Sequence, residues 1–381
     1  MKPPVVVHLI DGLSVGGAES ALFRLVSDPA MSGEACSVIA FMEGGENLDL
    51  MREAGVRVES LGLARGQVSL GAFMTLRRRL AALRPDIVVT WSATADLVGT
   101  LIAPLCGSPR VIWNIRQSAL RPGDCSRITS WAIRICAWLS RRMPLIVANA
   151  DAARDAHEAM GYHPNAWTII PNGFDLQEFK PNPAARRELR DELGIDSNTP
   201  LVGIAGRSYP GKDHATFVRA AEAMAERRPD VHYLMAGQGL DSANEALKQL
   251  APRLVDARGL HLLGLRHDMP RVLAALDVFT LTSLVEGCPN VVGEAMACGV
   301  PCVVTQSAGD GPAMVGDTGR VIPSRDPPAL TEAWVDCLSL KADERTKLAA
   351  SARARAEACY SLDAMRGRYR TLYARIQEGS A

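Results

Sequence analysis

The chain has 381 residues, and its 42 Lys and Arg residues are balanced by 42 Asp and Glu residues. This length predicts two domains rather than one core. Because the charge is balanced, nothing in the composition indicates a nucleic-acid partner. Nine scattered Cys residues include no Cys-x-x-Cys pair, so we expect reduced thiols and no disulfide framework.

No apolar run along the chain reaches transmembrane length. The first such run, Val5–Ile10, contains His8 and is too short for a signal peptide. We therefore expect a cytoplasmic protein without a signal peptide or a membrane-spanning helix.

Short β-branched runs alternate with helical patterns in the first half of the chain. The predicted strands are Val5–Ile10, Cys36–Phe41, Val56–Leu61, Ile87–Trp91, Val111–Ile115, Leu145–Ala148 and Trp167–Ile170. Amphipathic helices fit between them, for example at Gly71–Leu83 and Asp124–Arg141. This alternation predicts βαβ units and a parallel sheet.

A charged, proline-rich stretch after Pro171 predicts a linker, and a second series of strands follows it. Those strands are Leu201–Ala205, Val231–Ala236, Leu260–Leu263, Val278–Leu281 and Cys302–Thr305, and a long helical tail covers Leu330–Ile376. The predicted fold class is α/β, with two doubly wound Rossmann-like domains facing across a cleft. We predict domains at residues 1–175 and 176–360, with a final segment at 361–381.

The segment from Ser283 to Val304 carries two carboxylates, Glu286 and Glu294, across a predicted turn-to-helix junction. Asn290 is the predicted N-cap of that helix. Free amides at a helix start favour an anionic group, whereas carboxylates accept hydrogen bonds from hydroxyls. A ligand with both phosphates and hydroxyls is a nucleotide sugar. The alternative is a helix cap and a solvated helix glutamate.

The strand Leu201–Ala205 is followed by a loop that carries Arg207 and Lys212. Cations at such a loop can stabilise the charge that develops on a departing diphosphate. The alternative is two solvent-exposed cations. Because the chain contains no Asp-x-Asp motif, we expect transfer without a metal ion and without a cofactor.

The segment from Ser283 to Val304, with its Glu-Ala-Met-Ala-Cys-Gly-Val-Pro sequence, resembles the signature of the family 4 retaining glycosyltransferases, which have the GT-B fold. The resemblance extends over nearly the whole chain and includes bacterial surface-polysaccharide enzymes. It implies that Glu286 holds the donor sugar near its reacting carbon and that Glu294 holds the ribose. It implies further that Arg207 and Lys212 hold the diphosphate, and that the helix Leu362–Ile376 crosses back to the first domain.

Other donor-binding candidates follow from the same resemblance. Gly16 and Gly17, after the first strand, look like the family's first loop, with a plain structural turn as the alternative. The Gly-x-Gly-x-x-Gly spacing of a dinucleotide site is absent there. The remaining candidates are Gly287, Asn290, Val291 and Asp310.

One departure from the family pattern concerns the first domain. Many family members bring a His toward the reacting carbon, but Ser92 and Thr94 occupy the corresponding place after the strand Ile87–Trp91. Thr94, Asp96 and Arg116 are the acceptor-side candidates. His8 and His214 are expected to be a core histidine and a helix-start histidine.

The predicted helix Asp124–Arg141 is basic and carries two tryptophans. Arg127, Arg134 and Arg141 recur at seven-residue spacing, close to the face of Trp131 and Trp138. Such a helix can lie at the inner surface of a membrane or bind an anionic lipid-linked acceptor. The alternative is a core helix whose arginines reach water.

We expect a glycosyltransferase of the hexosyltransferase type that moves a sugar, with retention, from a nucleotide-diphosphate sugar to a hydroxyl acceptor. The expected product is a bacterial surface polysaccharide or a lipid-linked glycan. One alternative is a nucleotide-sugar-binding partner subunit with weak or no activity. Another is a sugar epimerase of similar two-domain architecture.

Overall fold

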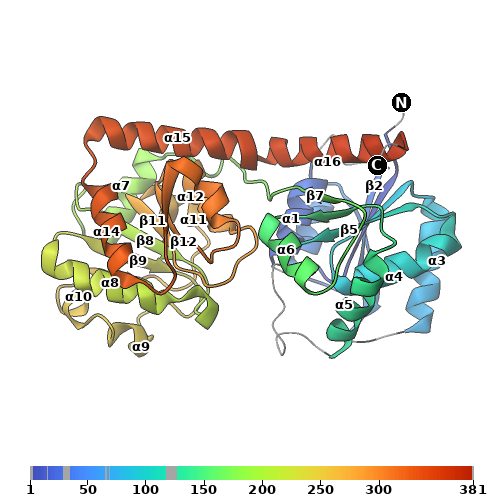
Figure 1. The fold of residues 1–381 in the computed structure, drawn as a ribbon, viewed down its shortest axis with the longest axis horizontal. Coiled ribbons are helices and arrows are strands. Elements are labelled where there is room, and N and C mark those ends of the chain that lie inside the picture. Colours follow the sequence, from blue (N-terminus) through green and yellow to red (C-terminus); the bar gives the residue numbers. More distant parts are fainter. Residues whose placement is uncertain are drawn as a thin grey trace. The chain divides into compact units, whose positions relative to one another are not determined.

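The computed structural model describes residues 3–14, 16–28, 35–64, 67, 69–116 and 127–379. The chain forms two compact units, each built around its own sheet (Figure 1). Unit 1 extends to Gly173 and resumes at Leu362, and unit 2 is Phe174–Ser361. The chain therefore passes between the units next to residues 173 and 361, where the backbone N–H of Phe174 donates to Tyr360 O at 2.8 Å.

In the described part of unit 1, one sheet of parallel strands has the order β3-β2-β1-β4-β5-β6-β7. Its strands are β1 (Val6–Ile10), β2 (Cys36–Met42), β3 (Arg57–Leu63), β4 (Ile87–Thr90), β5 (Arg110–Ile115), β6 (Ile146–Ala148) and β7 (Trp167–Ile169). The strand order reverses between β1 and β4, so the carboxyl ends of these two strands form the switch point where ligands bind in such sheets.

Helices cover both faces of this sheet (Figure 1). They are α1 (Gly17–Val26), α2 (Glu46–Glu53), α3 (Leu70–Leu83), α4 (Ala93–Ile102), the 3-10 helix η1 (Ala103–Cys106), α5 (Arg127–Ser140), α6 (Asp151–Ala159) and α16 (Leu362–Gln377). Leu76 of α3 and Ile102 of α4 belong to the core on one face. Leu25 of α1 belongs to the core on the other face, together with Tyr369 and Leu372 of α16. The predicted return of the last helix to the first domain is therefore confirmed.

In unit 2, the described residues form a second parallel sheet in the order β10-β9-β8-β11-β12-β13. Its strands are β8 (Leu201–Ala205), β9 (His232–Ala236), β10 (Leu260–Leu262), β11 (Val278–Leu281), β12 (Cys302–Thr305) and β13 (Gly319–Ile322). Here the order reverses between β8 and β11. Two doubly wound parallel sheets confirm the predicted fold class.

The helices of unit 2 pack around this sheet. They are α7 (Pro183–Leu193), η2 (Pro210–Lys212), α8 (His214–Arg227), α9 (Glu245–Lys248), α10 (Pro252–Asp256), α11 (Met269–Ala274), α12 (Asn290–Ala297), α13 (Gly311–Val315), η3 (Gly316–Thr318), α14 (Pro327–Leu338) and α15 (Ala342–Tyr360). The core includes Phe217 and Trp334, whose rings meet edge to face at 5.2 Å. The Trp334 indole N–H donates to Thr280 Oγ1 at 2.9 Å, which satisfies the polar atom of this buried side chain.

Residues at the two ends of helix α7 explain where it begins and ends. Asn182 caps it by accepting hydrogen bonds from the backbone N–H of Ala184 and Ala185, and Pro183 begins it. Gly194 ends it with φ 67°, a left-handed conformation that glycine adopts without strain.

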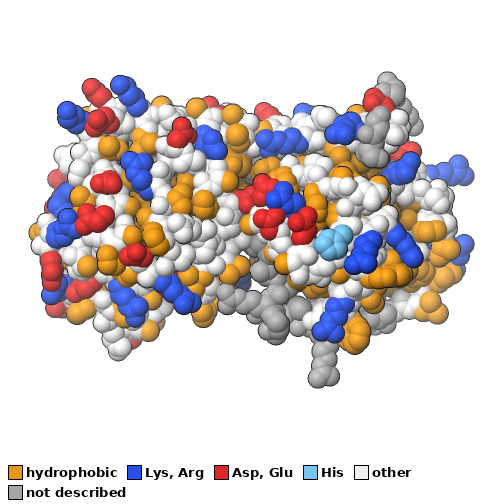
Figure 2. Space-filling view, in the orientation of Figure 1, with side chains coloured by type: hydrophobic (Ala, Val, Ile, Leu, Met, Phe, Trp, Pro, Cys, Tyr) orange, Lys and Arg blue, Asp and Glu red, His pale blue; other side chains and the backbone are white. Residues whose placement is uncertain are grey.

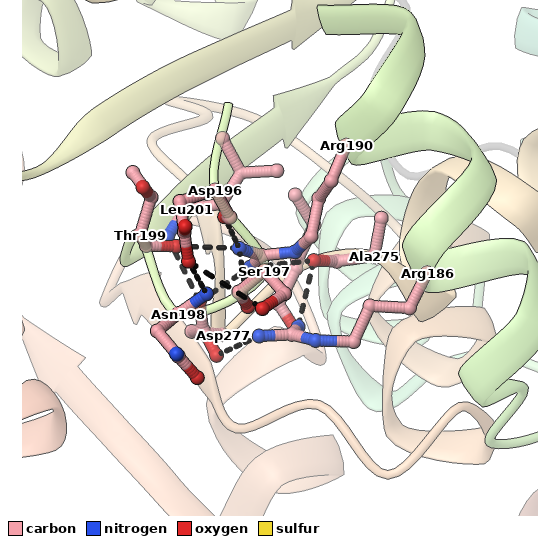
Figure 3. Close-up of polar contacts among 10 residues, drawn as sticks. Arg186, Arg190, Asp196, Ser197, Asn198, Thr199, Leu201, Ala275 and Asp277 are labelled. Atoms are coloured by element: carbon pink, nitrogen blue, oxygen red, sulfur yellow. Dashed lines mark hydrogen bonds and ion pairs between the residues drawn. The ribbon is translucent and has the colours of Figure 1, made fainter. Parts of the chain in front are cut away.

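The same helix is fastened to the sheet by a buried charge cluster (Figure 3). Arg190 is only 1% exposed, and its guanidinium donates to Asp277 Oδ2 at 2.8 Å and to Thr199 O at 2.6 Å. Arg186 donates to the other oxygen of Asp277 at 2.7 Å. Because Asp277 precedes β11 and also accepts from the N–H of Leu201 at 2.8 Å, the cluster lies at the amino-terminal edge of the sheet.

Candidate functional site

The loop between β8 and α8 is held by the segment that follows β11. Thr282 Oγ1 donates to the carbonyl oxygens of Lys212 at 2.9 Å and Asp213 at 3.0 Å. The N–H of Leu284 donates to Gly211 O at 2.8 Å. These bonds fix the backbone of Lys212 next to the carboxyl end of β11.

Lys212 and Glu286 form an ion pair at this place. Ser283 Oγ donates to the same carboxylate oxygen of Glu286 at 2.6 Å. The side chains are 24% and 15% exposed, so water screens the pair only partly. The structure therefore joins a predicted diphosphate cation to the predicted sugar-binding carboxylate, and a third residue orients that carboxylate.

Two further candidates lie in the loops around this pair. Arg207 follows β8 with an exposed side chain, and His214, the buried first residue of α8, contacts Arg207 O through Nε2 at 3.1 Å. The N–H of Asp310, after β12, donates to Gly287 O at 2.8 Å. This close approach needs Gly309, whose φ is +57° and whose added Cβ would clash with the carbonyl oxygen of Gly287.

Helix α12 supplies the remaining donor-site candidates. It begins at Asn290, so the predicted N-cap at this residue is wrong by one position. Pro289 occupies the cap position, where its φ of −72° and ψ of 100° are extended, as is usual for the residue before a helix. Asn290, Val291 and Glu294 are half-buried, and their spacing of three and four residues puts them on one side of the helix.

All these residues belong to one edge of the sheet of unit 2. Arg207 and Lys212 follow β8, Glu286 follows β11 and Asp310 follows β12, which are adjacent strands in the order β8-β11-β12. The carboxyl ends of parallel strands meet at the same edge, so the switch point between β8 and β11 gathers cations and carboxylates together.

In unit 1, Gly16, Gly17 and Thr94 follow the carboxyl ends of the neighbouring strands β1 and β4. Gly16 is the extended residue before α1, and Gly17 is the first residue of that helix. Asp11, which follows β1, lies near the hydroxyls of Ser92 and Thr94, which come after β4. Burial raises the pKa of Asp11, and the two hydroxyls partly offset this. Asp11 is absent from the predicted site; its position directly after an apolar strand is the signal that marks it.

Asp96, an acceptor-side candidate, lies in the interior of unit 1. It is 4% exposed and accepts a hydrogen bond from Thr90 Oγ1. Burial raises the pKa of Asp96 to about 8. Its carboxyl group is therefore largely protonated at neutral pH.

Arg116, the third acceptor-side candidate, makes several contacts within unit 1. Its guanidinium donates to Asn172 Oδ1 at 2.8 Å and to the Tyr369 hydroxyl, and it lies 5.0 Å from the Trp91 ring. These contacts connect the end of β5 to α16. His8, beside them, is fully buried and accepts from the Trp91 indole N–H at 3.0 Å, as predicted for a core histidine.

Among the described residues, no group of three or more His, Cys, Asp or Glu side chains is arranged to hold a metal ion. Cys288, Cys298 and Cys302 are buried thiols, and the Cys302 thiol donates to Val300 O at 3.4 Å. Within the same residues, no helix has both the length and the apolar character needed to cross a bilayer.

Two family descriptions match consecutive parts of the chain. Residues 15–178 match "Glycosyltransferase Family 4", and residues 199–339 match "Glycosyl transferases group 1". The chain belongs to glycosyltransferase family 4. The second match contains Arg207, Lys212, Glu286, Glu294 and Asp310.

Curated relatives are also glycosyltransferases by name. The chain is 29% identical over 245 residues to the UDP-Gal:alpha-D-GlcNAc-diphosphoundecaprenol alpha-1,3-galactosyltransferase of Escherichia coli. It is 30% identical over 217 residues to a GDP-mannose-dependent monoacylated alpha-(1-6)-phosphatidylinositol monomannoside mannosyltransferase of Corynebacterium glutamicum. These matches span 63% and 54% of this chain and 62% and 55% of the relatives' length.

The crystal structure of Anabaena Alr3699/HepE in complex with UDP superposes with a TM-score of 0.83 at 23% identity. The match covers 97% of this chain and 99% of that one. At this identity the likeness concerns the fold, which is GT-B.

Proposed function

We propose that this family 4 protein transfers a sugar from a nucleotide-diphosphate donor to a hydroxyl group, with retention and without a metal ion. The observation that carries the proposal is the Lys212–Glu286 pair at the switch point of unit 2. A cation and a hydroxyl-binding carboxylate in contact suit the junction between a diphosphate and its sugar.

Each residue has a distinct proposed role. Lys212 and the exposed Arg207 stabilise the charge on the departing diphosphate, which is the task a metal ion performs elsewhere. Glu286, oriented by Ser283, accepts hydrogen bonds from the sugar, and Glu294 accepts them from the ribose. Gly287, Asn290, Val291 and Asp310 are proposed to complete the donor site of unit 2. Gly16 and Gly17 are donor-binding candidates of unit 1.

Retention follows if the acceptor oxygen attacks on the face that the phosphate leaves. The bond from the anomeric carbon to the phosphate oxygen breaks, the bond to the acceptor oxygen forms, and the acceptor proton passes to the departing phosphate. No protein nucleophile is needed. Thr94 and Asp11 of unit 1 are proposed to contact the acceptor, because they follow β4 and β1, the two strands at that unit's switch point.

We also propose a lipid-linked acceptor at the cytoplasmic face of a bacterial membrane. The names of the two relatives specify a diphosphoundecaprenol-linked and a phosphatidylinositol-linked sugar. Their donors differ in base, so the experiment screens UDP, GDP and ADP and their sugars.

The test is a thermal-shift series with these nucleotides in the presence of EDTA. One nucleotide diphosphate is expected to stabilise the protein, and Lys212→Ala and Glu294→Ala are expected to weaken that effect. Lys248→Ala is the matched control, since Lys248 forms a similar Lys–Glu pair with Glu245 at 2.9 Å. Equal effects of Lys212→Ala and Lys248→Ala would contradict the assignment.

Turnover distinguishes an enzyme from a nucleotide-sugar-binding partner subunit. Release of nucleotide diphosphate from the stabilising donor is expected without added metal, and NMR of the product is expected to show the donor's anomeric configuration. Glu286→Gln should keep nucleotide binding but reduce transfer by about 10²-fold, because its proposed contact is to the sugar. Binding without any turnover would favour the partner subunit.

A further inference from the structure

Helix α5 of unit 1 exposes a face that is both hydrophobic and cationic. Trp131 is 63% exposed, Ile135 40% and Trp138 58%. Arg134 is also exposed, and the spacing of these positions forms one stripe along the helix. The exposed Arg141 lies in the turn directly after the helix. The opposite face is buried and contains Ala132, Ile133, Cys136 and Ala137. As far as the described residues show, the helix is therefore packed on the unit by one side, and its tryptophans lie on the other.

The charge on this face has one sign. The guanidinium of Arg134 lies 5.6 Å from the Trp131 ring, and that of Arg142 lies 4.6 Å from the Trp138 ring. Residues 129–142 contain no Asp or Glu. In a chain with equal numbers of acids and bases, this face is a local concentration of cations.

The neighbouring helix adds further apolar surface. Helix α4 packs against α5, and the Cys136 thiol contacts Ala93 O at 3.5 Å. Leu101, near the end of α4, is 55% exposed, and Leu105 of η1 is 53% exposed. Figure 2 shows hydrophobic side chains with Lys and Arg side chains among them over α4 and α5. A core helix would bury its tryptophans, so these residues need another explanation.

We propose that this face of α5, with Leu101 and Leu105, docks on the surface of an anionic phospholipid bilayer. The proposal rests on the proposed function, in which the acceptor is lipid-linked. Indole rings favour the membrane–water interface, where arginines reach lipid phosphates. An anionic leaflet attracts the arginines of residues 129–142, a range that contains no Asp or Glu, and this charge complementarity selects a bilayer over a second copy of this chain.

The experiment measures binding of the full chain to vesicles by sedimentation and by tryptophan fluorescence. Vesicles contain either phosphatidylglycerol and phosphatidylcholine in equal parts or phosphatidylcholine alone. Binding is expected only to the anionic vesicles and is expected to weaken with salt. A blue shift should accompany it, because Trp131 and Trp138 are exposed whereas Trp91, Trp113 and Trp334 are already buried.

Two pairs of substitutions locate the surface. Trp131→Ser with Trp138→Ser, and Arg134→Glu with Arg141→Glu, are each expected to weaken anionic-vesicle binding by at least about tenfold. The matched controls change exposed residues elsewhere: Leu50→Ser with Leu70→Ser, which are 45% and 79% exposed, and Arg219→Glu on α8. These controls are expected to bind as the unchanged protein does.

Several outcomes would overturn the proposal. They are no binding of the unchanged protein to anionic vesicles, equal binding by all variants, or a dimer that the Trp131→Ser and Trp138→Ser pair dissociates. The last result would assign the face to a second copy. Since the assay contains no nucleotide, donor or acceptor, its failure leaves the thermal-shift result for Lys212→Ala unaffected, and the two proposals fail separately.

Discussion

Asp96 is an acid whose environment changes its protonation. Burial is the main cause of its raised pKa, about 8, and the hydrogen bond from Thr90 only partly opposes this. The nearby Asp11 carboxylate adds to the increase. The folded protein therefore holds a proton on Asp96 in a pH range where the unfolded chain releases it.

This difference makes stability depend on pH. Because the folded pKa lies above the unfolded value of 3.8, the contribution is complete below about pH 4 and is lost as pH rises through 8. Between pH 5 and pH 9 the free energy of unfolding should fall by on the order of a few kcal/mol because of the Asp96 carboxyl group. Asp96→Asn should remove that part of the loss, as measured by urea unfolding at both pH values. An equally steep decline in the variant would mean that other groups dominate.

At the scale of elements, the buried cluster of Arg186, Arg190 and Asp277 fastens α7 to the amino-terminal edge of the sheet of unit 2 (Figure 3). The donor-site candidates lie at the opposite, carboxyl edge. The charge cluster that stabilises unit 2 and the residues proposed to bind the donor thus lie at opposite ends of the same strands.

Removing the carboxylate of Asp277 should therefore destabilise unit 2 without directly changing the proposed nucleotide contacts. Asp277→Ala leaves the guanidinium of Arg190 buried without its anion, and we expect a loss of about 3–5 kcal/mol in urea unfolding. Asp230→Ala is the control, since its pair with Arg228 is also 2.7–2.8 Å long but its carboxylate is 52% exposed. That change should lower stability by less than about 1 kcal/mol. Similar losses for both variants would show that burial of the pair is not decisive.

At the scale of the whole molecule, each unit has a core of its own. Trp334 and Phe217 belong to the core of unit 2, and Leu25 and Tyr369 to that of unit 1. The proposed diphosphate and sugar contacts of Lys212, Glu286 and Glu294 all belong to unit 2.

A bound nucleotide should therefore stabilise mainly one unit. At a concentration of about 100 times its Kd, the nucleotide diphosphate should add about 2.7 kcal/mol to the unfolding free energy of unit 2. Hydrogen exchange followed by mass spectrometry should show slower exchange in β9 and β12 than without nucleotide, and little change in β2 and β5. Equal protection of both sheets would indicate that the two units unfold together.

The amino-acid sequence by itself determined the class of fold and the family. Apolar runs such as Val278–Leu281 and turn residues such as Pro289 set the secondary structure of the few residues next to them. Strands and helices were therefore predicted within a few residues of their observed ends. The long match around Glu286 and Glu294 also needs no knowledge of distant contacts.

Tertiary structure alone decided which of these residues meet. The ion pair of Lys212 and Glu286 joins residues 74 positions apart, and the contact of Arg116 with Tyr369 spans 253 positions. The sequence pattern of α5 allowed either a core or a surface helix, and only packing exposed Trp131 and Trp138. Local propensity acts over a few residues, whereas burial and long-range contact depend on the order of strands in each sheet, because that order decides which loops become neighbours.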